Sequence, residues 1–188
     1  MTVLPITVIG HPVLEKRAKR VKHVTDDLRT LVADMFETND AADGAGLAAP
    51  QVGRSLRLFV VSCPDVHGVD HRTEVINPVL ERFGPLEMDE EYVEGCLSVP
   101  GLGRPTARFR GARVRGTDLE GREIVLEDEG GILARALQHE TDHLEGSLYL
   151  ARLAPMPRRE ILDEASARGW RRRGITTWDP TVQAADEV

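Results

Sequence analysis

The sequence predicts an α+β fold, because segments with strand character gather in the middle of the chain between two strongly helical segments. This order favours α+β over a parallel βαβ fold, in which helices and strands alternate. Hydrophobic residues form 41% and charged residues 29% of the 188 residues, a composition ordinary for a globular protein. The length fits one domain over residues 1–188 with a core of its own.

The first helix is expected to begin after Thr25 and to end at residue 41 or 42. Thr25 suits the N-cap position, and the two aspartates after it suit the positive end of the helix dipole. An Asp-Gly pair at 43–44 ends the pattern, and residues 11–23 are expected to form a loop with a short turn. The apolar face recurs at helical spacing and comprises Leu28, Leu31, Val32, Met35 and Phe36.

The middle of the chain has strand character in four segments. The apolar run Leu56–Ser62 predicts a buried strand. Thr73–Phe83 predicts a second strand that is interrupted, or lies at an edge, at Pro78, and a Gly-Pro pair at 84–85 predicts a turn after it. Two alternating segments around a DLEG turn, within residues 110–128, predict a hairpin.

A second helix is expected to begin after the glycine pair at 130–131 and to stop at Gly146. A third helix is expected over about residues 157–169, followed by a tail with a loose end. The C-terminal region 155–188 is therefore predicted to hold a helix and a flexible tail. The second helix carries an apolar stripe of Ile132, Leu133, Ala136, Leu137 and Leu144.

The net charge of −7 argues against a dedicated binder of nucleic acid or of anionic membranes. The arginine run at 171–173 is interpreted as a solvated helix end. No apolar run approaches the ~18 residues of a membrane span. The N-terminal residues lack the basic region and cleavage site of a signal peptide, so a cytoplasmic protein is expected. In a reducing cytosol, Cys63 and Cys96 are expected to be free or metal-bound rather than paired.

The most informative motif is HETDH, at residues 139–143. On an α-helix, which turns ~100° per residue, His139 and His143 lie about 40° apart and can converge on one ion. Glu140 lies about 60° from His143 and borders that face. A carboxylate there is no ligand but is close enough to exchange a proton with a water at the metal. The alternative is an exposed helix with polar pairs and no ion.

Two histidines need a third ligand, and the sequence offers three kinds of candidate. The metzincin zinc-protease motif requires a histidine at position 149, where this chain has Tyr149. A thermolysin-like site would take a glutamate from a later helix, for which Glu160 and Glu164 are available. Cys96, in the turn-like segment EGCLSVPG, would complete a Cys-His-His set with a fourth position open. Cys96 could instead be an inert packed thiol, as Cys63 is interpreted to be.

The segment GAGLAAPQ, residues 44–51, is rich in small residues that permit close approach of the backbone to a ligand. Gln51 offers an amide donor, which beside a metal site can stabilise the oxygen charge that develops in acyl transfer. The alternatives are ordinary loop glycines and a glutamine that caps a loop.

These three segments, GAGLAAPQ, EGCLS and HETDH, occur in this order, and together they resemble the bacterial-type peptide deformylases. The signatures of that family are GxGLAAxQ, EGCLS and HExDH, and all three are complete. The resemblance runs from about Pro5, through the segment His11–Leu14, to about Leu153. The tail after Pro155 is not covered by it.

The resemblance implies an α+β fold in which antiparallel β-sheets pack around a central helix that carries HETDH. It implies that Cys96, His139 and His143 bind one divalent metal ion per chain, most often Fe²⁺. Zn²⁺, Ni²⁺ and Co²⁺ are alternatives, because thiolate and imidazole ligands suit several of these metals. It also implies that Glu140 is the acid/base catalyst.

The resemblance further implies that the Gln51 side chain and the backbone N–H of Leu97 hold the oxyanion. An extended substrate chain is expected to bind against Gly46 and Ala45. Asp142 is a candidate for supporting the metal ligands, with an ordinary surface aspartate as the alternative.

The family often has an arginine shortly after CLSxP that helps to orient this region. Here both Arg104 and Arg108 are present, and the sequence does not assign the role to either.

The implied reaction is removal of the N-formyl group from the N-terminal methionine of newly synthesised polypeptides, with release of formate. The expected partners are N-formylmethionyl nascent peptides, with transient ribosome contact as a further hypothesis. Neither a membrane nor a specific nucleic acid is expected as a partner. Two competing hypotheses are a metallopeptidase that cleaves ordinary amide bonds and a non-catalytic relative that docks at the ribosomal exit.

Overall fold

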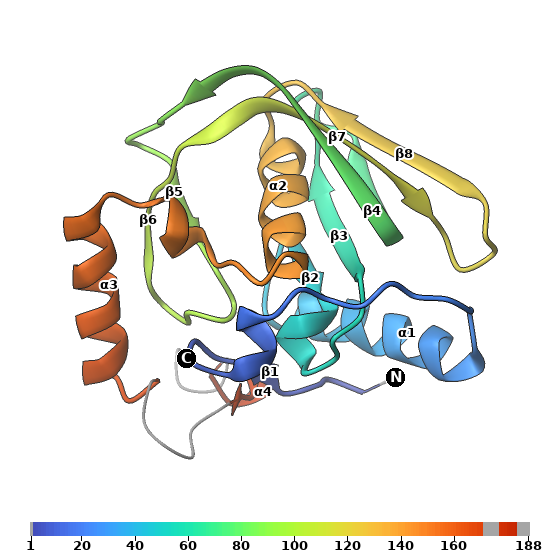
Figure 1. Ribbon diagram of the computed structural model, residues 1–188, viewed down its shortest axis with the longest axis horizontal. Coiled ribbons are helices and arrows are strands. Elements are labelled where there is room, and N and C mark those ends of the chain that lie inside the picture. The colour runs from blue at the N-terminus through green and yellow to red at the C-terminus, as the bar shows by residue number, and fades with distance from the viewer. Residues whose placement is uncertain (1, 171–176, 184–188) are drawn as a thin grey trace.

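Helix α2 (Ile132–Leu144) stands at the centre of the protein, and the other elements pack around it (Figure 1). The fold is described from a computed structural model, over residues 2–170 and 177–183. Both expected glycine boundaries are confirmed, since Gly131 is the N-cap residue and Gly146 follows the helix with a φ of 76°. The carboxylate of Asp128 accepts hydrogen bonds from the N–H groups of Gly131 and Ala134, so it caps the helix.

An antiparallel sheet of five strands packs against α2, in the order β2-β3-β4-β7-β8. The hairpin expected within residues 110–128 is confirmed as β7 and β8. Strand β2 forms one edge of this sheet, so one side of its backbone is open to a further strand. The five strands are β2 (Gly46–Ala48), β3 (Leu58–Pro64), β4 (Asp70–Glu87), β7 (Arg108–Thr117) and β8 (Glu123–Asp128).

Strand β4 is longer than the sequence predicts. It continues through residues 84–85, so the turn expected there is wrong. The interruption expected at Pro78 is a shift of register between Ile76 and Val79 rather than a break. A second shift lies between Phe83 and Leu86. Both prolines therefore fall in irregular parts of the ladder, where a missing N–H removes no regular hydrogen bond.

Two small antiparallel sheets complete the strands. One pairs β5 (Val93–Gly95) with β6 (Gly103–Pro105), and the other pairs β1 (Ile6–Thr7) with β9 (Thr177–Trp178). Residues 177–178 of the tail that was predicted to be flexible form β9, which pairs with the backbone of β1. Helix α4 (Pro180–Gln183) follows. The arginine run at 171–173 and residues 184–188 lie outside the described residues.

The remaining helices follow the expected signals closely. Helix α1 (Asp26–Ala41) begins where the hydroxyl of Thr25 accepts a hydrogen bond from the Leu28 N–H at 3.2 Å. Helix α3 (Pro155–Ala167) begins slightly earlier than expected, because a proline at the first helical position needs no N–H partner. Three short 3₁₀ helices join these elements: η1 (Pro12–Glu15), η2 (Ala49–Val52) and η3 (Tyr149–Arg152).

Three buried apolar clusters lie behind the three sequence motifs. The first joins α2 to the sheet through residues such as Phe59 and Leu133. The second joins α1 to β2 and includes Met35 and Leu47. The third surrounds Cys96 with residues of η3 and α3. The motifs are thus fixed on three packed units that meet at α2. No helix among residues 2–170 and 177–183 has the length and apolar character needed to cross a bilayer.

Candidate metal centre

The ligand atoms of Cys96, His139 and His143 all lie within 4.8 Å of one another, and all three residues are buried. Nε2 of His143 lies 3.3 Å from the Cys96 sulfur and 3.2 Å from Nε2 of His139. A tetrahedral ion with bonds of about 2.0–2.3 Å separates its ligand atoms by roughly 3.3–3.6 Å. The donor set and its spacing therefore fit one divalent metal ion, with a fourth position open.

The other candidates for the third ligand are excluded by their positions. Tyr149 is buried against the site, and its hydroxyl donates a hydrogen bond to the Leu102 carbonyl at 3.3 Å. Glu160 lies 3.7 Å from Arg104, and Glu164 lies 2.7 Å from Arg168 on the same helix. The structure therefore brings Cys96 to the histidines and leaves both glutamates on α3.

Cys63 is the second cysteine of the chain, and it lies in β3 within the cluster between the sheet and α2. Burial raises the pKa of its thiol to about 12, with a further increase from the charge of Glu140. A thiol that stays protonated is neither a good ligand nor a nucleophile. The structural interpretation of Cys63 is confirmed by this position, and both cysteines are free thiols.

A carboxylate that the sequence analysis did not single out holds the first histidine. Nδ1 of His139 lies 2.6 Å from Oε1 of Glu94, so the other ring nitrogen, Nε2, faces Cys96 and His143. Burial alone would raise the pKa of Glu94, but hydrogen bonds from Arg108 and His139 bring that pKa down to about 2. Glu94 is therefore an anion that fixes the tautomer of a metal ligand. Its place at the start of the EGCLS signature, two residues before Cys96, is the sequence signal that could have identified it.

Arg108 rather than Arg104 organises this region. Its side chain is buried between Glu94, which binds Nε and a terminal nitrogen, and Asp142, whose Oδ2 lies 2.6 Å from the other terminal nitrogen. Arg104 is half-exposed, and within the described residues its side chain reaches its neighbour's carbonyl and Glu160. Arg108 therefore ties the Cys96 segment to the metal-bearing helix.

Asp142 completes the network on the far side of Arg108. Its carboxylate also accepts two hydrogen bonds from Arg152 of η3, at 2.6 and 2.7 Å. Burial opposes ionisation of Asp142, but the two arginines hold its pKa below the usual value. The alternative of an ordinary surface aspartate is excluded, because Asp142 is buried and joins α2 to β7 and η3.

Glu140 lies beside the ligand atoms with no hydrogen-bond partner for Oε2 among the described residues. Burial raises its pKa to about 7. Gly46 faces it so closely that a Cβ at residue 46 would lie 2.9 Å from Cγ of Glu140. The glycine is required here by close packing against the carboxylate rather than by loop flexibility.

Gln51 points its amide nitrogen into the site. Its Oε1 accepts a hydrogen bond from the Ala48 N–H at 2.8 Å, which fixes the orientation of the amide because a backbone N–H can only donate. Nε2 then lies 3.8 Å from the sulfur of Cys96. Helix η2 therefore presents an amide donor at the position where the sequence analysis expects one.

A pocket of about 600 Å³ opens in front of these groups. Gly46 and Ala45 line one side of it, and residues 93–97 line the other. The Ser62 N–H donates to the carbonyl of Ala45, so by strand alternation the polar groups of Gly46 face away from β3. Among the described residues, the Leu97 N–H has no protein acceptor. The pocket thus offers backbone groups to an extended chain.

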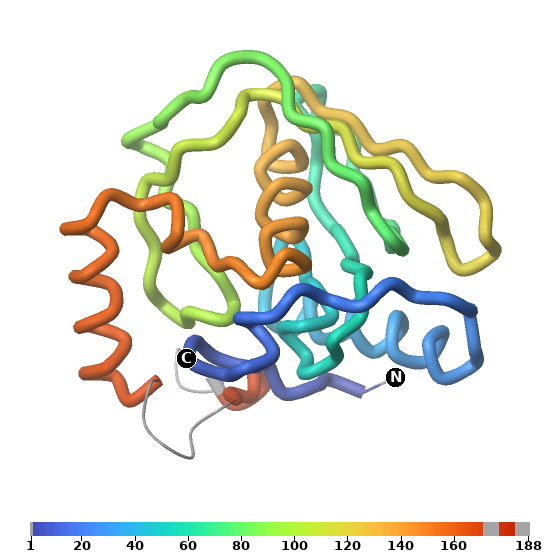
Figure 2. Tube along the Cα trace, viewed as in Figure 1, coloured from blue at the N-terminus to red at the C-terminus, as the bar shows by residue number. Residues whose placement is uncertain are grey.

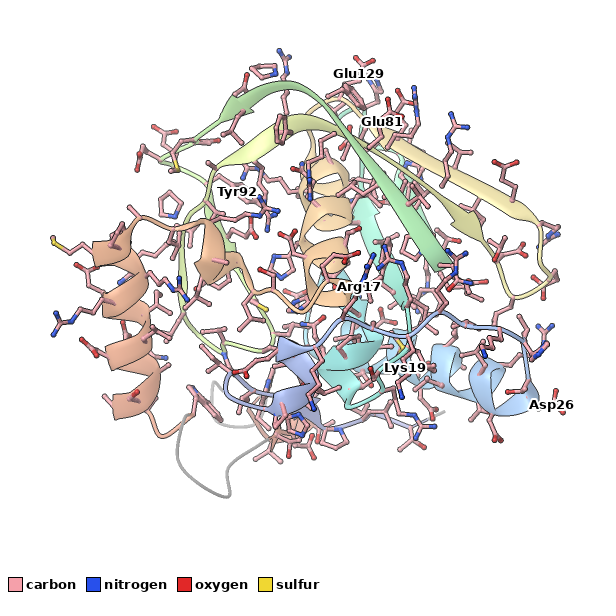
Figure 3. All side chains as sticks on the ribbon, viewed as in Figure 1. Arg17, Lys19, Asp26, Glu81, Tyr92 and Glu129 are labelled. Carbon is pink, nitrogen blue, oxygen red and sulfur yellow. The ribbon has the colours of Figure 1, made fainter. Side chains whose placement is uncertain are left out.

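Arg135, Tyr92 and Trp178 are among the residues that line the pocket without having been predicted from the sequence. The guanidinium of Arg135 lies over the ring of Tyr92, 4.4 Å from its centroid, and Trp178 comes from the tail. Figure 3 shows Tyr92 beside α2, on the segment that leads into β5. None of the three belongs to a catalytic motif, and only their positions in the fold reveal them.

Comparison with known proteins gives concordant results. Residues 3–159 match the family model described as polypeptide deformylase. The chain is 44% identical over 186 residues to "Peptide deformylase 2" of Corynebacterium efficiens, covering 97% of this chain and 95% of the relative. It is 45% identical over 190 residues to the peptide deformylase of Mycolicibacterium smegmatis, covering 96% and 95%.

Solved structures agree with the sequence relatives. The peptide deformylase of Ehrlichia chaffeensis in complex with actinonin matches with a TM-score of 0.78 and 34% identity, covering 89% of this chain and 98% of that one. The peptide deformylase of Thermus thermophilus matches with a TM-score of 0.75 and 43% identity, covering 88% and 94%. The expected α+β fold around the central helix is confirmed.

Replacing Arg108 by Met is expected to destabilise the protein by about 3–5 kcal/mol, because it leaves Glu94 and Asp142 as buried charges with a partner removed. Urea denaturation measures the loss, and metal titration is expected to show weaker binding. Arg104→Met is the matched control, since its partner is exposed, and it is expected to change stability by less than about 1 kcal/mol. Equal effects of the two substitutions would contradict the assignment to Arg108.

Replacing Gly46 by Ala is expected to displace the Glu140 carboxylate, because the new Cβ would lie within 3.0 Å of both Cγ and Oε1. Turnover is expected to fall at least about 10-fold while metal content is retained, since the ligands are untouched. Steady-state kinetics and metal analysis on the same preparation check this. Unchanged turnover would show that the carboxylate has room to move.

Proposed function

The chain belongs to the polypeptide deformylase family, and we propose that its Cys-His-His site, Glu140, Gln51 and Leu97 carry out the reaction of that family. The protein is a metal-dependent hydrolase that removes the N-formyl group from the N-terminal methionine of newly synthesised polypeptides and releases formate. The observation that carries the assignment of residues is the convergence of Cys96, His139 and His143 beside Glu140.

Cys96, His139 and His143 would hold the metal, and the buried thiol and imidazoles are ligand types that divalent transition metals prefer. When bound, such an ion supplies a Lewis acid that lowers the pKa of water and polarises a carbonyl oxygen. We propose Fe²⁺ as the native ion from the family resemblance, with Zn²⁺, Ni²⁺ and Co²⁺ as alternatives.

Glu140 is proposed as the residue that moves the proton of the reaction. Its carboxylate accepts the proton of the attacking water and returns it to the amine that leaves as the formyl C–N bond breaks. The close contact with Gly46 and the buried surroundings hold the carboxylate in one position beside the ligand atoms. A carboxylate held there would lie next to the formyl carbon of a bound peptide.

The amide of Gln51 and the backbone N–H of Leu97 stabilise the oxyanion that forms on the formyl oxygen. Each such donor contributes about 3 kcal/mol in comparable sites, because it is already oriented before charge develops. The orientation of Gln51 by the Ala48 N–H supports this role. The lack of an acceptor for the Leu97 N–H among the described residues supports it as well.

The substrate chain binds as an extended segment along the open edge of β2. Gly46 and Ala45 provide one side of this binding site, and the pocket continues toward Tyr92 and Arg135. We propose that residues 1–188 form one catalytic domain, which acts in the cytoplasm on N-formylmethionyl nascent peptides. A transient contact with the ribosome would bring it to them.

The direct test is formate release from formyl-Met-Ala-Ser by protein purified without oxygen and loaded with Fe²⁺ or Ni²⁺. Turnover is expected with the formylated peptide only. Failure to release formate after loading with either metal would contradict the proposed function. Cleavage of unformylated peptides would indicate a metallopeptidase instead.

Glu140→Gln is expected to keep metal and to lose turnover by about 10²- to 10⁴-fold, because an amide cannot accept the proton. Formate release and metal content measured on the same sample separate the two effects. Glu145→Gln is the matched control at the end of the same helix, where the carboxylate is part-exposed and pairs with Arg17 and Arg57. Full activity in Glu140→Gln would contradict the assignment of Glu140 as the acid/base residue.

A further inference from the structure

The C-terminal segment returns to the N-terminus beside the site. The described tail, residues 177–183, lies next to the first strand in Figure 2. In this pairing Ile6 lies opposite Trp178, and Thr7 lies opposite Thr177. The family model ends at residue 159, so β9 lies beyond the part of the chain that it matches. None of the roles assigned above involves this segment.

The side chain of Trp178 reaches from β9 to the turn that carries the catalytic groups. Its Nε1 donates a hydrogen bond of 2.7 Å to the carbonyl of Leu97. Leu97 follows the metal ligand Cys96 and provides the proposed oxyanion donor. Trp178 therefore contacts the residue that is the proposed oxyanion donor, from an element more than eighty residues away along the chain.

The turn at 96–98 has all three of its carbonyl groups engaged. The Cys96 carbonyl accepts from the Val99 N–H at 2.8 Å, and the Ser98 carbonyl accepts from the Ile9 N–H at 2.8 Å. The bond from Trp178 to Leu97 is the third. Ile9 lies just after β1, the strand that pairs with β9, so the two ends of the chain hold this turn together.

Trp178 is also a wall of the pocket. It is half-buried, and it lines the pocket together with Gly44 and Leu97. A Cβ at Gly44 would lie 3.0 Å from Cδ1 of Leu97, so these residues are packed closely on this side. An aromatic ring there offers an apolar surface to a peptide in the pocket.

We propose that Trp178 is a positioning and specificity residue for the deformylation of peptides. Its N–H holds the Leu97 carbonyl, which restricts rotation of the turn and keeps the adjacent Leu97 N–H directed at the oxyanion. Its ring contacts the residues of the substrate that follow methionine. The inference rests on the proposed function, because it assigns these contacts to the deformylation site.

Two substitutions in the full chain separate the two parts of the role. Trp178→Phe keeps an aromatic ring and removes the N–H, so kcat is expected to fall about 5-fold with KM nearly unchanged, the effect of one lost hydrogen bond. Trp178→Ala removes the ring as well, and KM for formyl-Met-Ala-Ser is expected to rise about 5- to 10-fold in addition. A KM that stays normal in Trp178→Phe and rises in Trp178→Ala would show that the aromatic ring contacts the substrate.

Trp170→Phe is the matched control. Trp170 is the other tryptophan of the chain, and its buried Nε1 has no acceptor among the described residues, so this substitution removes an indole N–H without removing a bond. Its kcat and KM are expected to equal those of the unmodified protein. Metal content and melting temperature of each variant show whether the variant folds. If Trp178→Ala does not fold, Trp178→Phe alone tests the positioning role.

Amide hydrogen exchange of the segment 94–101 gives a readout that does not depend on turnover. Exchange at this turn is expected to be about 5-fold faster in Trp178→Phe than in Trp170→Phe. Equal exchange and equal kinetic constants in these two variants would overturn the inference. An unmodified protein that releases no formate would instead contradict the proposed function, and the exchange comparison would still decide whether Trp178 holds the turn.

Discussion

The burial of an unbroken polar run on the central helix is the constraint on which the rest of the structure depends. Residues 138–143 of α2 are all polar and all buried. A buried polar group without a partner costs about 1–3 kcal/mol, so such a helix is stable only if its surroundings supply partners. The sheets, the Cys96 turn and η3 are arranged so that they do.

Most of the partners come from other elements of the fold, which lie far from one another in the sequence. Gln138 pairs its amide with both backbone groups of Phe109, in the manner of a neighbouring strand. His139 binds Glu94, and Asp142 binds Arg108 and Arg152. Two fully buried side-chain atoms of the run remain without a partner among the described residues, Oε2 of Glu140 and Nδ1 of His143. One of them belongs to the group that must exchange a proton, which is where an unsatisfied atom is useful.

The same network explains why a cysteine sulfur, two imidazoles and three carboxyl groups coexist in a small buried volume. The charges of Glu94 and Asp142 are offset by Arg108, which lies between them, and by Arg152. Glu140 has no such partner, and burial therefore raises the pKa of this carboxyl while the pKa values of the other two are lowered. Carboxylates of identical chemistry thus take different roles because of their neighbours.

Local patterns brought forward the three candidate ligands that the structure places together. Helical geometry pairs His139 with His143, and the family resemblance adds Cys96 where the metzincin match fails at Tyr149. The patterns could not choose between Arg104 and Arg108, since that choice depends on which side chain β7 turns toward α2. The sequence also could not predict that β4 continues through two prolines. A shift of register depends on how two strands pair, and this pairing is not visible in the sequence of one strand. Trp178 lay in a stretch with no motif, and only pairing with β1 gives it a role.

The most direct test of the central claim is metal analysis of protein purified without oxygen, with Cys96→Ala compared against Cys63→Ala. Both cysteines are buried, but Cys96 is assigned as a metal ligand and Cys63 as a residue of the apolar core. The account predicts about one metal ion per chain in the unmodified protein and in Cys63→Ala, and loss of the ion in Cys96→Ala. Full metal content in Cys96→Ala, or loss of metal in a folded Cys63→Ala, would contradict it.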